Sequence, residues 1–183
     1  MLKIHELHNR ESLKTLAEYC RDIFHYSRKD VESLVGKLLG GEDQKLESHV
    51  IYAECLGEMA GFIIFCYYPQ NKVGFLEALV VIDEFRNQGI GAELYWNMID
   101  MLREKHPECI GHVLEMCQDE ANYVERKKFF LRQGSIPLDL GFFMNAPEAA
   151  EIRMLYHPYR IDQRYSLGLM ENILKEINSD IIH

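Results

Sequence analysis

One stretch of this 183-residue chain joins an apolar run to a glycine-containing turn. It reads Leu79-Val-Val-Ile-Asp-Glu-Phe-Arg-Asn-Gln-Gly-Ile-Gly-Ala92. Glycine lets the main chain approach a ligand closely, and the start of a helix presents unpaired N–H groups with a partial positive charge. Such a turn can bind a phosphate or pyrophosphate, to which Arg86 can add charged donors. The alternative is a tight turn that needs Gly89 and Gly91 only for packing.

Two other phosphate-binding turns do not fit this spacing. A P-loop has a Lys and then Ser or Thr directly after its last glycine, and no such pair follows Gly91. A Rossmann turn has a third glycine where this chain has Leu94, and it belongs to a parallel sheet. The strands that precede the turn here are predicted to be antiparallel. The turn is therefore predicted to be of another type.

Strands and helices alternate around the turn. Period-two alternation predicts a first strand at Leu2–Leu7, and helical spacing predicts helices over 13–24 and 31–39. Further strands are predicted at His49–Cys55, Met59–Tyr68, Val73–Ile82, Gly111–Cys117 and Ile152–Tyr156, and helices at 89–106, Ala121–Gln133 and Gln163–Asn178. The continuous apolar run at Leu79–Ile82 predicts burial on both faces of its strand. This order predicts an α/β (mixed α+β) sheet flanked by helices, in a single domain over residues 1–183.

Composition excludes several classes of protein. Hydrophobic residues make up 48% of the chain, and 20 Lys and Arg against 29 Asp and Glu give a net charge of −9, which argues against nucleic-acid binding. No apolar run reaches the roughly 18 residues of a membrane span, and the first residues carry charges where a signal peptide is apolar. Five cysteines without a Cys-x-x-Cys pair, and histidines without metal spacing, predict no metal site and fit the cytoplasm.

Two stretches resemble a known family. Arg86-Asn-Gln-Gly-Ile-Gly91, between a strand and an amphipathic helix, resembles the acetyl-CoA-binding signature Gln/Arg-x-x-Gly-x-Gly/Ala of the GNAT acyltransferase superfamily. Arg126-Lys-Lys-Phe-Phe-Leu-Arg-Gln-Gly134 is similar to the family's later helix, which ends in an aromatic pair and x-Arg-x-Gly. The resemblance implies a GNAT-like, mostly antiparallel sheet with a splayed parallel central pair. It also implies acetyl-CoA as the cosubstrate and no metal.

The resemblance further implies roles for individual residues. The main chain of one strand would pair with the pantetheine arm, N–H groups from Gln88 to Ala92 would bind the pyrophosphate, and Lys127 would lie near the nucleotide. For Lys127 a solvated helix face is the alternative. The implied cofactor-binding residues are Leu79, Val80, Val81, Arg86, Asn87, Gln88, Gly89, Ile90, Gly91, Ala92 and Lys127.

Acyl transfer from a thioester requires a neutral amine and a leaving thiolate. Glu77, two residues before the pantetheine-binding run, is the first candidate for the general base, because apolar neighbours such as Phe75 would raise its pKa. A rim residue paired with a neighbouring strand is the alternative for Glu77. Glu115, on the next strand, is the second candidate base, and a position at a water-facing strand edge is its alternative.

The expected proton donor is missing from its usual place. Many family members have a tyrosine as the second residue of the aromatic pair, where its hydroxyl can protonate the thiolate, whereas this chain has Phe130. Tyr123 lies seven residues earlier on the same helical face, but two turns of helix are about 10 Å, too far for a direct replacement. Three alternatives remain: the thiolate leaves without a proton donor, another hydroxyl acts as the donor, or catalysis has been lost.

The chain is therefore predicted to be an acetyl-CoA-dependent N-acetyltransferase whose acceptor is a primary amine of a small molecule or peptide. The amine would attack directly in a ternary complex. A catalytically impaired acyl-CoA-binding sensor or interaction module is the alternative, which Phe130 keeps open. The acidity of the chain favours a cationic acceptor without identifying it. No nucleic-acid or membrane partner is expected, and a homodimer is compatible with the family.

Overall fold

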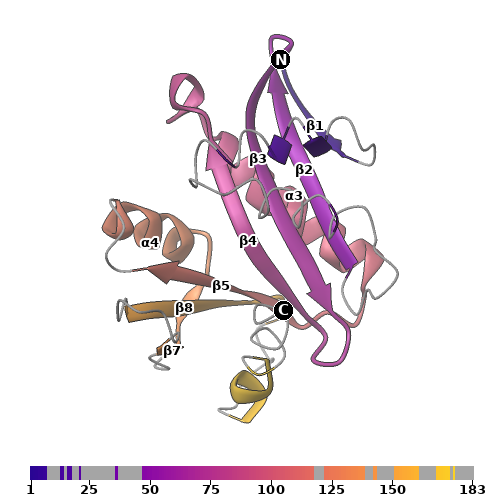
Figure 1. Cartoon of the computed structure of the whole chain (residues 1–183), viewed down its shortest axis with the longest axis vertical. Helices are drawn as coiled ribbons and strands as arrows, with labels where there is room; N and C mark the ends of the chain where they lie inside the picture. The colour runs from indigo at the N-terminus through magenta and orange to yellow at the C-terminus, as the bar shows by residue number, and fades with distance from the viewer. Residues whose placement is uncertain are drawn as a thin grey trace. The chain divides into compact units, whose positions relative to one another are not determined.

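The computed structural model describes residues 1–7, 13–14, 16–17, 21, 36, 47–117, 122–138, 142–143, 151–160, 168–173 and 175. Its elements (Figure 1) are β1 (Leu2–Glu6), β2 (Glu47–Cys55), β3 (Glu58–Tyr68), β4 (Val73–Val81), the short 3-10 helix η1 (Asp83–Phe85), α3 (Ile90–Lys105), β5 (Gly111–Cys117), α4 (Tyr123–Arg132), β6 (Ile136–Pro137), β7 (Phe142–Phe143) and β8 (Glu151–Pro158). The helices predicted over 13–24, 31–39 and 163–178 fall largely outside the described residues.

The strands follow the order β1-β2-β3-β4-β5-β8-β6, and β7 pairs with β8. Strand β4 is parallel to β5, whereas the pairs β1–β2, β2–β3, β5–β8, β6–β8 and β7–β8 are antiparallel. The predicted mixed sheet with one parallel pair is therefore confirmed. The parallel register joins Val73–Leu76 to Gly111–Leu114, while β4 continues to Val81 and β5 to Cys117.

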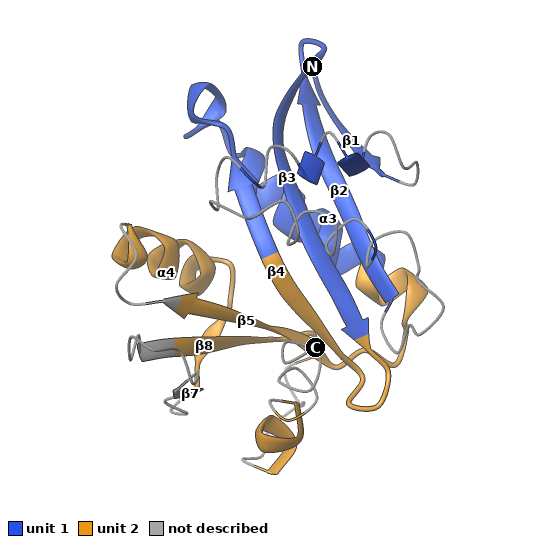
Figure 2. Cartoon of the chain, in the orientation of Figure 1, with its two compact units in different colours: residues 1–67, 78–101 blue, residues 68–77, 102–183 orange. Residues whose placement is uncertain are grey.

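The chain forms two compact units, and each draws on two separate segments of the sequence. Unit 1 consists of residues 1–67 and 78–101, and unit 2 of residues 68–77 and 102–183 (Figure 2). The boundary crosses β4 between Glu77 and Ala78. The glycine-containing turn therefore lies in unit 1, and both candidate bases lie in unit 2.

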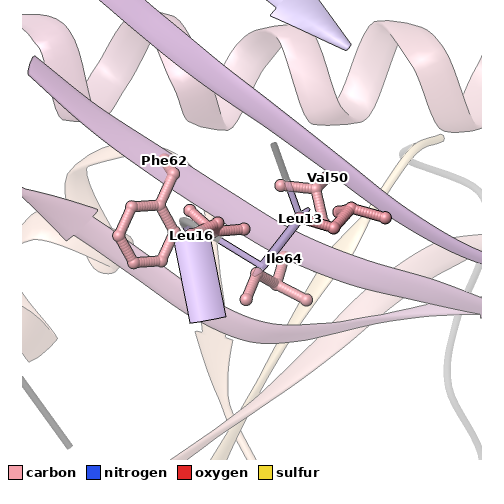
Figure 3. Close-up of a cluster of buried hydrophobic side chains, with 5 residues drawn as sticks. All are labelled: Leu13, Leu16, Val50, Phe62 and Ile64. Atoms are coloured by element: carbon pink, nitrogen blue, oxygen red, sulfur yellow. The ribbon is translucent and has the colours of Figure 1, made fainter. Parts of the chain in front are cut away.

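Unit 1 is held together by apolar side chains on both faces of its strands. One cluster, of residues at most 2% exposed, consists of Leu13, Leu16, Val50, Phe62 and Ile64 (Figure 3). Side chains alternate between the faces of a strand, so Gly61 faces away from this cluster. On that second face, α3 packs close to the strand: a Cβ added to Gly61 would lie only 3.3 Å from Cδ1 of Leu94. Helix α3 buries a stripe formed by Ile90, Leu94, Tyr95, Met98 and Ile99, which fixes the position of its first turn.

Unit 2 contains a buried histidine pair. His112 of β5 and His157 of β8 are registered partners, and their rings stack with centroids 5.1 Å apart. His112 Nδ1 lies 3.2 Å from the hydroxyl of Tyr159, whose carbonyl accepts a 2.8 Å hydrogen bond from Arg103. Burial, together with the charge of Arg103, lowers the pKa of His157 to about 4, and burial lowers the pKa of His112 well below its ordinary value. The pair is therefore neutral in the folded protein at neutral pH.

This pair should make stability depend on pH. Between the ordinary histidine pKa of 6.5 and about 4, unfolded histidines bind protons that the folded pair does not. The free energy of unfolding should therefore fall as the pH drops through this window. From about pH 7 to about pH 5 the loss from His157 alone should be about 2 kcal/mol. Urea unfolding at both pH values measures this loss, and His157→Gln should reduce it; an undiminished loss in that variant would contradict the assignment.

Candidate active site

The turn between β4 and α3 is braced by its own side chains. Arg86 lies 2.7 Å from the carboxylate of Asp83, and its Nε donates a 3.3 Å hydrogen bond to the carbonyl of Val81. Asn87 and Gly89 have φ angles of 61° and 84°, in the left-handed region that glycine adopts without strain. Arg86 thus contacts a carboxylate and a main-chain carbonyl of its own turn, two contacts that its motif position alone did not reveal.

The first turn of α3 presents main-chain N–H groups. The N–H groups of Ala92 and Glu93 both donate to the carbonyl of Gly89, at 3.0 and 3.1 Å. The N–H groups of residues 88–91 have no main-chain acceptor within the described part of the chain. Gln88 and Gly89 are exposed, and a Cβ on Gly89 would meet no atom within 4 Å. Four of the five predicted N–H donors thus remain available to an anion, while that of Ala92 serves the helix.

The last residues of β4 have a main-chain edge that none of the described strands covers. Ala78 and Val80 pack against the cluster of Leu13 and Leu16, and the Ile82 N–H donates to the Ala60 carbonyl of β3. On the opposite edge, pairing with β5 stops at Leu76, and no described strand pairs beyond it. The residues from 79 to 82 are only partly buried, so the predicted burial on both faces is wrong. Free N–H and C=O groups on a strand edge can bind an extended amide-containing ligand.

The two candidate bases follow the parallel ladder directly. Glu77 and Glu115 each come one residue after the last registered pair, Leu76 and Leu114. Glu77 is exposed, so the apolar neighbours that were expected to raise its pKa do not bury it. Glu115 instead has a buried Oε1 that finds no hydrogen-bond partner among the described residues. Burial raises the pKa of Glu115 above its ordinary value.

Helix α4 contains most of the second family-like stretch, Arg126–Gly134. Phe130 is buried, and its ring meets that of Phe129 edge to face, with centroids 5.1 Å apart. Lys127 lies over the ring of Tyr123, its Nζ 5.7 Å from the centroid. The hydroxyl of Tyr123 is buried and has no hydrogen-bond partner among the described residues. Lys127 is therefore partly engaged within its own helix, while Lys128 is exposed.

Comparison with known proteins identifies the family of this chain. Residues 3–134 match the model of the Acetyltransferase (GNAT) family. The chain belongs to the GNAT acetyltransferase family. It is 31% identical over 123 residues to an uncharacterized N-acetyltransferase of Archaeoglobus fulgidus, a match that covers 64% of this chain and 75% of that protein. The chain is accordingly a member of a family of N-acetyltransferase enzymes, and the predicted fold and family are confirmed.

Solved GNAT structures share the fold. A ribosomal-protein alanine N-acetyltransferase of Escherichia coli gives a TM-score of 0.62 at 18% identity and covers 90% of this chain and 100% of its own. A Bacillus anthracis protein assigned as a streptothricin acetyltransferase, solved with acetyl coenzyme A, gives 0.54 at 17% identity, covering 66% of each chain. These identities show the GNAT fold alone. Among the described residues, no helix has the length and apolar character needed to cross a bilayer.

Proposed function

We propose that this GNAT protein transfers the acetyl group of acetyl-CoA to a primary amine of a small molecule or peptide, by direct attack in a ternary complex. The observation that carries the proposal is the continuity of β4 with the start of α3. A strand edge that no described strand pairs with leads within a few residues to four N–H groups for which the described residues offer no main-chain acceptor. An extended arm followed by a diphosphate matches that order of binding groups, and acetyl-CoA has this chemistry.

Each part of the donor would have its own partners. The N–H groups of residues 88–91 would bind the pyrophosphate, helped by the partial positive charge of the helix start. The main chain of Leu79, Val80 and Val81 would pair with the amides of the pantetheine arm, and the carbonyl of Val81 would then share or exchange the hydrogen bond that it accepts from Arg86. Lys127 would contribute charge toward the nucleotide. Arg86 would hold the turn through Asp83 and Val81, and its remaining N–H groups would add charged donors toward the pyrophosphate.

The thioester would then lie near Glu77, which precedes Leu79 by two residues on the same strand. Glu77 is exposed, so water and an incoming ammonium group can reach its carboxylate. It would take the ammonium proton, directly or through water, and free the nitrogen lone pair for attack on the acetyl carbonyl.

A sensor that binds acetyl-CoA without turnover is the second candidate, and the observation that favours it is the buried Phe130 at the usual position of the proton donor. One experiment separates the two. Calorimetry measures acetyl-CoA binding, and a panel of small amines and peptides is incubated with acetyl-CoA and analysed by mass spectrometry. We expect saturable binding and a mass gain of one acetyl group on at least one amine. Binding without any acetylated amine would favour the sensor, and no binding would refute both.

A further inference from the structure

Glu115 stands out through its surroundings at the end of the parallel ladder. Its Oε1 is buried and receives no hydrogen bond from any described residue. An ionised oxygen without a donor is costly to bury, whereas a protonated carboxyl carries no charge. The site therefore favours the carboxylic acid form of Glu115, and the raised pKa of this group has the same cause, desolvation.

Glu77, on the neighbouring strand, has the opposite environment. Glu77 stands at the equivalent position of β4, directly after the registered pair of Leu76 and Leu114, and it is exposed. Water solvates an exposed carboxylate as the anion. Two carboxyl groups whose environments favour different protonation states are suited to different roles, one as a base and the other as an acid.

We propose that Glu115 is the proton donor to the leaving thiolate, in a chain where Phe130 has no proton to give. This inference rests on the function proposed above. Glu115 is then not the second candidate base but the general acid, which acts together with Glu77 as the base. Both carboxyl groups belong to unit 2, at the branch point where β4 and β5 stop pairing.

Every proton of the proposed transfer can be followed from its donor to its acceptor. The neutral amine nitrogen forms a bond to the acetyl carbonyl carbon, and the carbon–sulfur bond then breaks. Sulfur keeps the electron pair of that bond and takes the carboxyl proton of Glu115, which gives the free thiol of CoA. The nitrogen loses its extra proton to the Glu115 carboxylate and restores the acid. Glu77 releases the ammonium proton to water, so each acetyl transfer frees one proton.

The leaving group provides the test. Acetyl-seleno-CoA keeps the body of the donor but leaves as a selenolate, which needs no proton because a selenol is much more acidic than a thiol. In Glu115→Gln we expect kcat with acetyl-CoA to fall about a hundredfold, at the low end for general acids because a thiol has a pKa of about 8.5. With acetyl-seleno-CoA the same variant should fall less than about threefold.

Each outcome decides the question. Equal losses with both donors would assign Glu115 to the base or to positioning, and no loss with acetyl-CoA would remove it from catalysis; either result overturns the proposal. The acetyl-CoA affinity of Glu115→Gln, measured by calorimetry, shows whether the variant is folded. In the unmodified enzyme, rates across donors with differently acidic leaving groups should vary little, and a steep dependence would also overturn the proposal. Absence of acetyl transfer by the unmodified enzyme would instead refute the proposed function itself.

Discussion

Glu77→Gln should lower kcat for amine acetylation about a thousandfold and leave the acetyl-CoA affinity unchanged. Glutamine has nearly the shape of glutamate but cannot accept a proton from an ammonium group at neutral pH. The main chain of β4 and the N–H groups of α3 are untouched, so donor binding should persist. Steady-state rates give kcat, and calorimetry gives the dissociation constant of acetyl-CoA.

Two controls accompany this variant. Glu104→Gln removes another exposed carboxylate of unit 2, at the end of α3, and should leave both quantities unchanged. Glu77→Asp keeps the basic group on a shorter arm and should restore part of the lost rate. A Glu77→Gln enzyme with nearly full kcat would exclude Glu77 as the base.

Gly89→Ala should weaken acetyl-CoA binding about thirtyfold or more. A methyl group at this position would project into open space, and Gly89 belongs to the row of N–H groups of residues 88–91 that is proposed to bind the pyrophosphate. Loss of one or two hydrogen bonds to a charged group corresponds to about 2 kcal/mol. Calorimetric titration with acetyl-CoA measures the effect.

The chain supplies a matched control for backbone strain. Gly57, in the hairpin between β2 and β3, has a φ of 87° and, like Gly89, has no atom within 4 Å of an added Cβ. Gly57→Ala should therefore lose stability by a similar amount, roughly 1 kcal/mol, and bind acetyl-CoA normally. Equal losses of affinity in the two variants would show that strain, and not the binding site, causes the effect.

Much of the fold could be predicted because local signals were strong. The strand at Gly111–Cys117 has the predicted bounds, and α3 begins one residue after Gly89. Leu13 and Leu16, at helical spacing, are fully buried. The partial exposure of Leu79–Val81 could not be predicted, because it depends on where pairing between β4 and β5 stops. A run of apolar residues contains no information about that point.

The candidate site, too, could be predicted from the sequence only in part. Gly89 and the row of N–H groups follow from a local motif, which the sequence displays directly. The difference between Glu77 and Glu115 depends on neighbours from other strands, so the residues within one strand predicted the raised pKa for Glu77, whereas burial raises the pKa of Glu115. The ion pair of Arg86 with Asp83 has a local spacing, but the same spacing occurs in many exposed turns without such a pair.

The unit boundary inside β4 has a mechanical consequence. Glu77 is the last residue of a segment of unit 2, and Ala78 is the first residue of a segment of unit 1. Both belong to the same continuous strand, β4. Neighbouring residues of a strand are about 3.3 Å apart along its axis, so covalent geometry alone fixes Glu77 about 7 Å from Leu79. The strand would thus set the spacing between the proposed proton acceptor and the main chain that is proposed to hold the pantetheine arm, independently of the packing on either side of it.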